Sequence, residues 1–203
     1  MSEPFWRRPV YALCCCVVII LIATGIRQSF GLFVKPITIE MGWAFGAFSS
    51  AVAIQNLMIG LGAPLLGSIA DRWGPVRVIV MAALFYVTGL VLMSQSVTPM
   101  EMRLSAGFLI GLGVSGCGLP LLLSIIGRVA PEGNRSMWLG IVTAGATAGQ
   151  MLVVPLSQSL IDLHGWLTTV LILAAAAALI VPLAASMARG GTVEIDKKTR
   201  QSL

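Results

Sequence analysis

The sequence predicts an all-α membrane protein with six transmembrane helices. Of its 203 residues, 57% are hydrophobic and only 10% are charged, whereas a soluble domain carries about 25% charged residues. Apolar runs of about 18 residues or more are typical of helices that cross a bilayer. Six such runs follow one another with short connections: residues 11–34, 47–66, 76–96, 102–124, 136–158 and 166–187.

These runs predict one transmembrane bundle, residues 11–187, between an N-terminus of residues 1–10 and a polar tail of residues 188–203. Arg7 and Arg8 precede the first run, as they would in a signal peptide. However, the apolar core is longer than the roughly 7–15 residues of such a peptide, and no small-residue cleavage site follows. We therefore expect the first run to stay as a helix.

The basic residues alternate between the predicted ends of the helices, which accounts for the net charge of +5 without a nucleic-acid partner. Lys and Arg favour the cytoplasmic side of a membrane. Both termini are therefore expected in the cytoplasm, with the lipid bilayer as the surrounding partner. The residues expected on that side are Arg7, Arg8, Arg72, Arg77, Arg128, Arg135, Arg189, Lys197, Lys198 and Arg200.

Residues that could support catalysis or bind a metal do not form a recognisable set. Cys14, Cys15 and Cys16 are adjacent, Cys117 is far away in sequence, and no CxxC spacing occurs. We interpret them as free cysteines that behave as small apolar residues. His164 is the only histidine. The glycines follow helix-packing intervals rather than a phosphate-binding pattern, so we expect no enzyme activity, no cofactor and no metal.

The stretch "GSIADRWGPVRV", residues 67–78, places charged and turn-forming residues between the second and third runs. Gly67 would allow a close approach of helices, and Pro75 suits the first turn of a helix. Arg77 can pair with Asp71 or meet lipid phosphates. A loop on the positive side always contains arginine, but this does not explain the acidic residue at a helix end.

This stretch resembles the G-x-L-a-D-r-x-G-r-[rk] signature of the major facilitator superfamily. The matching residues are Gly67, Asp71, Arg72, Gly74 and Arg77, while Pro75 and Val76 depart from the pattern. "RLSAGFLIGLGVSG", from Arg103, resembles the signature of the fourth helix. "GIRQSFGLFVKPI" and "EMGWAFGAFSSAVAIQ" resemble the first two helices of monocarboxylate- and organic-anion-transporter-like members.

The resemblance implies one half of the major facilitator fold, because the family has twelve helices in two related halves. The chain resembles the N-terminal six-helix half. Its implied partner is a missing C-terminal six-helix half or a second copy in a parallel homodimer. The resemblance also implies that these five matching residues form a gate on the cytoplasmic side. In this gate Asp71 would face a helix N-terminus, which favours a carboxylate. In a homodimer this would be the start of the fifth helix of the other copy, near Ser136.

Arg27 is the strongest candidate for a substrate-binding residue, because it lies well inside the first predicted helix. A charge there costs about 2.5–3.5 kcal/mol and usually faces a cavity or a partner. One interpretation is that the side chain extends to the outer interface. The other is that the side chain binds a substrate anion, since a guanidinium forms two parallel hydrogen bonds with a carboxylate. No acidic residue lies inside a predicted span, which favours anion binding, with Gln28 and Thr24 beside it.

Arg103 begins a helical face whose other members are small: Gly107, Gly111, Ser115 and Gly118. Small residues allow close helix packing in lipid, which accounts for the glycines. The family resemblance implies a role for Arg103 in proton coupling.

Three amides in the predicted spans can also contact substrate. Gln55 and Asn56 are expected chiefly to bond neighbouring helices, and Gln55 is the better candidate for lining a pathway. Gln150 could reach the same pathway from the fifth helix, where Gly145 and Gly149 form a small-xxx-small pair.

The resemblance, together with Arg27, therefore implies a secondary transporter of small organic anions, and the resemblance implies the inner (plasma) membrane as its location. Its energy would come from an ion gradient, with protons as the expected ion of a symporter, because no ATP motif occurs. Two alternatives remain: a truncated or accessory half without independent activity, and efflux of drugs or toxic compounds.

Overall fold

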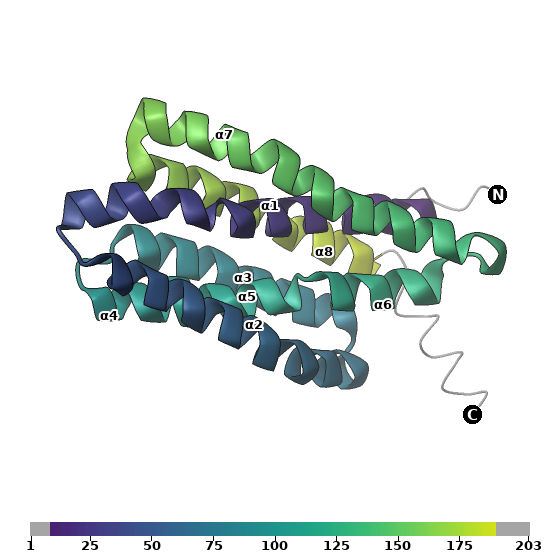
Figure 1. The fold of residues 1–203 in the computed structure, drawn as a ribbon. Helices are drawn as coiled ribbons and strands as arrows, with labels where there is room; N and C mark the ends of the chain where they lie inside the picture. The colour runs from purple at the N-terminus through teal and green to yellow at the C-terminus, as the bar shows by residue number, and fades with distance from the viewer. Residues whose placement is uncertain (1–8, 190–203) are drawn as a thin grey trace.

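The computed structural model describes residues 9–189 of the chain. The predicted N-terminus of residues 1–10 and the tail of residues 188–203 lie almost wholly outside these residues. Figure 1 shows the helices, which the chain forms in this order: α1 (Pro9–Met41), α2 (Phe45–Trp73), α3 (Pro75–Ser94), α4 (Pro99–Met102), η2 (Arg103–Leu109), α5 (Ile110–Gly116), α6 (Leu119–Val129), η3 (Glu132–Asn134), α7 (Arg135–Ala178) and α8 (Ile180–Arg189).

Five helical stretches of the described residues are long and apolar enough to cross a membrane. The last of them, Arg135–Met187, has 53 residues and folds back on itself (Figure 1). The reversal occurs at Gly165, whose backbone has φ 78° and ψ 167°, a left-handed conformation that glycine adopts readily. This fold divides the last stretch into two helices, so the six predicted apolar segments recur in order. Several helices extend beyond the predicted runs, because polar residues at the interface continue the helix.

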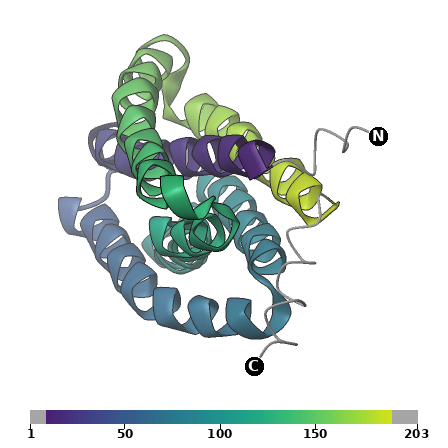
Figure 2. The same cartoon turned by 90° about the vertical axis from the view of Figure 1, so that its right-hand side faces the viewer.

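The helices run back and forth along one axis (Figure 1). Viewed along the bundle, α1 and α6 lie in the middle, α2 and the first part of α7 to one side, and α3 and α8 to the other (Figure 2). At one end, Tyr11 Oη donates a hydrogen bond to Ser186 Oγ, 2.9 Å away, which joins the start of α1 to α8. At the opposite end, Trp166 Nε1 donates to Glu40 Oε2 and joins the end of α1 to α7.

Glycines bring α1 and the first part of α7 into direct backbone contact. A Cβ atom added at Gly149 would collide with the carbonyl group of Leu21, and one at Gly25 would lie 2.7 Å from the carbonyl oxygen of Gly149. Small residues permit this approach, and van der Waals packing then holds the helices together in lipid. The predicted Gly145–Gly149 pair therefore has a packing role.

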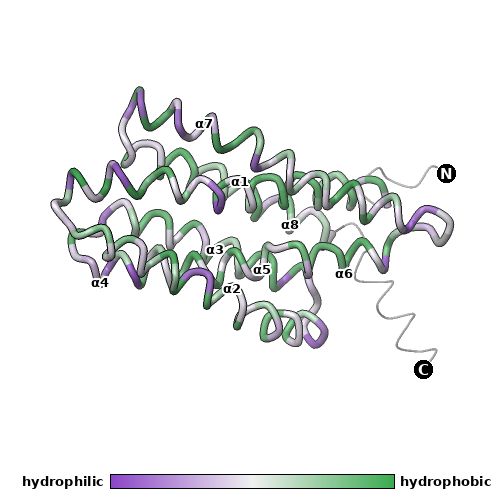
Figure 3. Tube along the Cα trace, in the orientation of Figure 1, coloured by the Kyte–Doolittle hydropathy of each residue, from purple (hydrophilic) through white to green (hydrophobic). Residues whose placement is uncertain are grey.

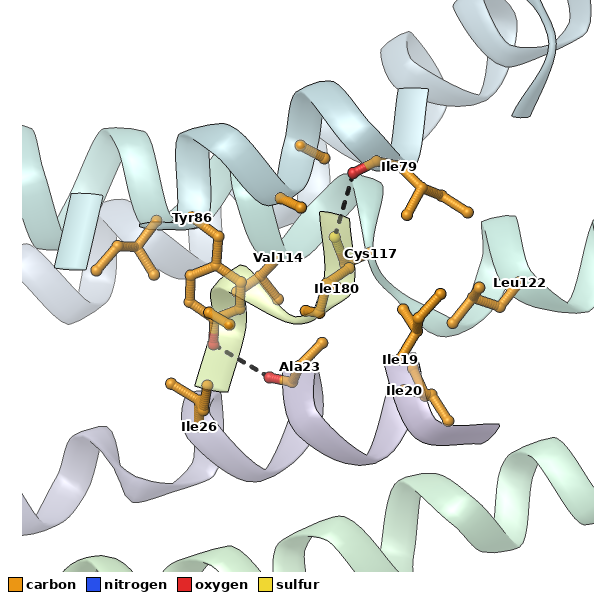
Figure 4. Close-up of a cluster of buried hydrophobic side chains, with 14 of the residues drawn as sticks. Ile19, Ile20, Ala23, Ile26, Ile79, Tyr86, Val114, Cys117, Leu122 and Ile180 are labelled. Carbon is orange, nitrogen blue, oxygen red and sulfur yellow. Dashed lines mark hydrogen bonds between the residues drawn. The ribbon is translucent and has the colours of Figure 1, made fainter. Parts of the chain in front are cut away.

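The fourth apolar segment packs closely on two neighbours. A Cβ atom at Gly113 would lie 2.7 Å from the backbone of Tyr86 in α3, and one at Gly111 would lie 3.0 Å from the carbonyl oxygen of Gln55 in α2. Tyr86 is fully buried and donates a hydrogen bond from Oη to the carbonyl oxygen of Ala23, at 3.1 Å (Figure 4). The small face predicted from Arg103 thus packs against α2 along much of its length.

The fourth apolar segment is also interrupted. It begins with a capping box, in which Thr98 accepts from the Glu101 N–H and Glu101 accepts from that of Thr98. A π-helical turn, Arg103–Leu109, follows. The helix ends at Gly116 and begins again at Leu119, because Pro120 has no N–H to continue the ladder.

The turn between α2 and α3 confirms the prediction that Pro75 lies in the first turn of a helix. Gly74 has φ 92°, and its N–H donates to the carbonyl oxygen of Ala70 at 2.9 Å. Pro75 occupies the first turn of α3, where its fixed φ suits the helix and its missing N–H has no cost.

Candidate functional site

Arg27 lies in the middle part of α1 and reaches across to α2. Its Nη2 atom donates a hydrogen bond to Oδ1 of Asn56, 3.0 Å away. The arginine side chain is partly exposed and Asn56 is exposed. The guanidinium therefore lies on an open face of the described bundle, where a small anion could reach it.

The acidic residues of segment 9–189 all lie near the ends of helices, and one of them, Glu132, begins η3. Glu40 ends α1, Asp71 ends α2, Glu101 begins the fourth segment, and Asp162 precedes the turn at Gly165. Figure 3 shows the same pattern, with hydrophilic positions gathered at the two ends of the bundle and a few along α1 and α2. Arg27 is thus a cation whose described partner is a neutral amide.

The other predicted substrate residues have different surroundings. Gln28 is exposed beside Arg27, and Gln150 is partly buried in α7. Gln55 is only 2% exposed, and its Nε2 atom has no hydrogen-bond partner among the described residues. None of the described hydrogen bonds joins these three glutamines to Arg27. Thr24 bonds instead to the carbonyl oxygens of Ile20 and Ala146, linking α1 to α7.

Asn56, rather than Gln55, is the amide that contacts Arg27. The buried residues Phe48, Ala51, Gln55 and Gly62 form one stripe along α2 at intervals of three, four and seven residues. This stripe faces inward, so Gln55 points into the helix packing and Asn56 lies about 100° further round the helix. The spacing of these small and apolar residues could have indicated the orientation of α2 from the sequence alone.

Arg103 is also bound to α2, by its Nε atom, which donates to Ser50 Oγ at 2.9 Å. The serine hydroxyl in turn donates to the carbonyl oxygen of Ala47 at 2.7 Å. Glu101 accepts from the N–H groups of Val97 and Thr98, at 2.8 and 3.2 Å. Glu101 is thus bonded to the backbone that precedes it, and Arg103 lies at the first position of the π-helical turn.

The predicted gating residues lie at the opposite end of the bundle. Asp71 Oδ1 forms an ion pair with Arg128 Nη2 of α6 at 3.0 Å, a contact that we did not predict; pairing with Arg77 was one of the two roles that we considered for that arginine. Arg72 and Arg77 are exposed. A Cβ atom added at Gly67 would meet nothing within 4 Å. No described helix packs closely on Gly67, so a close helix approach at this position stays a prediction.

Comparisons with known proteins relate this geometry to a family. The family model of the Major Facilitator Superfamily matches residues 13–201. Monocarboxylate transporter 2 of Mesocricetus auratus is 30% identical over 148 residues, which is 70% of this chain and 30% of that protein. The 4-hydroxybenzoate transporter PcaK of Pseudomonas aeruginosa is 28% identical over 169 residues, which is 82% of this chain and 36% of that protein.

Two solved structures share the fold. The xylose transporter XylE from E. coli, in an inward-open conformation, aligns with a TM-score of 0.72 and 15% identity, over 86% of this chain and 47% of that one. A bacterial homolog of the human lysosomal transporter Spinster aligns with a TM-score of 0.67 and 17% identity, over 93% and 44%. The chain thus spans less than half the length of these relatives. Its multi-pass helical bundle and its family match together place the chain in the major facilitator superfamily, a family of membrane transporters rather than enzymes, where it corresponds to an N-terminal half of the fold.

Proposed function

We propose that this chain is the substrate-binding half of a secondary transporter for small organic anions. The observation that carries the proposal is the guanidinium of Arg27, which is partly exposed on α1 and bound to a neutral amide at 3.0 Å. An arginine inside a spanning helix is costly unless it faces a cavity or a partner. A carboxylate substrate would supply the missing negative charge in a bidentate geometry. The named substrates of two relatives, monocarboxylates and 4-hydroxybenzoate, belong to this chemical class.

The remaining predicted residues complete the proposal. Gln28, Gln55 and Gln150 would contact substrate, and Arg103 would couple transport to an ion gradient, with protons as the proposed ion. The end of the bundle with Arg72, Arg77, Arg128 and Arg135 would face the cytoplasm, since basic residues favour that side. Asp71 and the stretch 67–78 would then act as the cytoplasmic gate of a carrier in the inner (plasma) membrane.

Transport needs a second set of helices, because major facilitator transporters have two halves. We propose that this set is a second copy of the chain or a C-terminal six-helix half. Native mass spectrometry of the purified protein in nanodiscs separates these cases. A dimer supports self-assembly, and a monomer that transports only with an added half supports a split carrier.

The test of anion transport is uptake of labelled benzoate and lactate into proteoliposomes of the assembled protein. Arg27→Gln should lower uptake at low substrate concentration at least tenfold. Arg27→Lys should give an intermediate value, because lysine keeps the positive charge but cannot form the bidentate contact. Lys35→Gln, which removes an exposed charge nearer the end of the same helix, is the matched control and should transport normally. Uptake that is unchanged in Arg27→Gln would contradict the proposal.

A further inference from the structure

The hydrogen bonds of Asn56 determine what it offers to Arg27. Its Nδ2 atom donates to the carbonyl oxygen of Val52, 2.9 Å away and one turn earlier in α2. Its Oδ1 atom accepts from Arg27 Nη2 at 3.0 Å. The amide nitrogen is therefore bound to the backbone of its own helix, and the amide oxygen is the atom that meets the guanidinium.

This arrangement holds the guanidinium by a single bond and leaves its charge intact. A guanidinium has five N–H donors, and two of its edges each present a parallel pair of N–H groups. Each of these edges uses a different hydrogen of Nη2. Asn56 accepts only one of these two hydrogens, so the edge that contains the other hydrogen keeps both of its donors. Two donors are the number that a carboxylate needs for a bidentate contact.

The position of Asn56 separates this contact from the packing of α2. Its neighbour Gln55 is buried, with its backbone against Gly111 in the fourth segment. Asn56 is exposed on a different side of the helix. A substitution at Asn56 should therefore change the surroundings of Arg27 without disturbing the contact between α2 and α5.

We propose that Asn56 is a positioning and charge-selecting residue for a monocarboxylate bound by Arg27. Its single hydrogen bond orients the guanidinium. Because the amide is neutral, the positive charge of Arg27 stays available to a substrate anion. A carboxylate at the same place would occupy Arg27 internally and exclude a substrate anion. This inference rests on the proposed function and adds the residue that makes the site selective for an anion.

Two substitutions distinguish this role from a merely structural link between α1 and α2. Asn56→Asp keeps an oxygen acceptor for Arg27 and strengthens the link, but places a competing negative charge there. Asn56→Leu removes the acceptor and leaves the charge of Arg27 available. A structural link predicts that Asn56→Leu is the more damaging change, whereas a charge-selecting role predicts that Asn56→Asp is.

The measurement is the half-saturation concentration and the maximal rate of labelled benzoate uptake in proteoliposomes, with lactate as a second probe. We expect Asn56→Asp to raise the half-saturation concentration at least tenfold, and Asn56→Leu to raise it about threefold to tenfold. The maximal rate should change less than the half-saturation concentration. Gln95→Glu, which adds the same charge at the exposed end of α3, is the matched control and should leave both values unchanged.

Each result has one meaning. A greater loss of affinity in Asn56→Asp than in Asn56→Leu, with thermal unfolding close to wild type in both, supports the inference. Equal losses, or a greater loss in Asn56→Leu, would overturn it while the dependence on Arg27 could still stand. Wild-type protein that shows no saturable uptake of either anion would instead overturn the proposed function, and the inference would fall with it.

Discussion

At the scale of single residues, polar side chains in the apolar helices form two kinds of hydrogen bond. Some bond the carbonyl oxygen one turn earlier in their own helix, as Ser29 does to Gly25 at 3.0 Å and Thr38 to Val34 at 2.6 Å. Such a bond satisfies the hydroxyl locally, so it can lie among apolar groups at little cost. Others, such as Arg27 and Arg103, bond a side chain of another helix. The second group contains the two candidate arginines, whereas Gln55 belongs to neither group because its Nε2 atom has no partner among the described residues.

The ion pair of Asp71 and Arg128 belongs to the residue scale and gives a prediction. The two side chains are 69% and 47% exposed, and an exposed ion pair contributes between zero and about 1 kcal/mol to stability. Asp71→Asn should therefore lower the free energy of unfolding in detergent by no more than about 1 kcal/mol. If Asp71 acts in a gate, the same substitution should change the rate of anion uptake severalfold.

Lys35→Gln is the control for this prediction, since it removes an exposed charge that lies outside the proposed gate. The free energy of unfolding and the rate of anion uptake are measured for both variants. A large loss of stability with Asp71→Asn would show that the ion pair is a structural contact instead of a gate.

At the scale of helices, the packing of α1 on α7 depends on the absence of side-chain atoms. Gly25 and Gly149 lie where the two backbones come together, and Gly145 packs against Val17 and Ile20 of α1. In lipid, the apolar environment gives no hydrophobic drive for association, so the closeness of the contact matters more than in water. A methyl group at such a position must push the helices apart.

We therefore predict that Gly149→Ala lowers the free energy of unfolding by about 1–3 kcal/mol, the usual cost of overpacking. Gly140→Ala is the matched control, because it lies on the same helix and an added Cβ atom meets nothing within 4 Å. Equilibrium unfolding in mixed micelles measures both variants. Equal stability of the two variants would contradict the close packing of α1 and α7.

At the scale of the whole molecule, charge is distributed unequally between the two ends of the bundle. Arg72, Arg77, Arg128 and Arg135 lie at the end where α1 begins and α8 ends. The other end has Lys35 and Arg103, together with Glu40, Glu101 and Asp162. Membrane insertion places the more basic loops in the cytoplasm. The positive-inside rule then predicts that the end with the four arginines faces the cytoplasm.

This distribution predicts the labelling of engineered cysteines in intact cells. A membrane-impermeant maleimide should label His164→Cys, near the turn between the two parts of α7, without permeabilisation. It should label Gly133→Cys, between α6 and α7, only after the membrane is opened. The four native cysteines are first replaced by alanine, because Cys14 is exposed on α1. Labelling in the reverse pattern would overturn the orientation.

Much of the fold could be predicted from the sequence, because the features concerned are local. The number and order of the apolar segments follow from hydropathy, and the turn at Gly74 and Pro75 follows from backbone stereochemistry. The packing role of Gly145 and Gly149 follows from their spacing. Arg27 could be singled out because a charge inside an apolar run is conspicuous whatever surrounds it.

The candidate site was less predictable, because its contacts depend on how each helix is rotated and where it lies. Whether Gln55 or Asn56 meets Arg27 depends on the face that α2 turns toward α5. Arg128 is 57 residues from Asp71 in sequence and meets it only because α6 packs beside α2. The π-helical turn at Arg103 was not predicted from the sequence either.

The sequence by itself determined that this protein is a bundle of apolar helices with one strongly basic end and an arginine inside its first helix. These properties depend on the chemistry of each segment in contact with lipid and water. Only the tertiary structure decided that a neutral amide holds this arginine and that Asp71 has a partner in α6. The physical reason is that side-chain partners are set by close packing between helices, and residues distant in sequence meet only when that packing is complete.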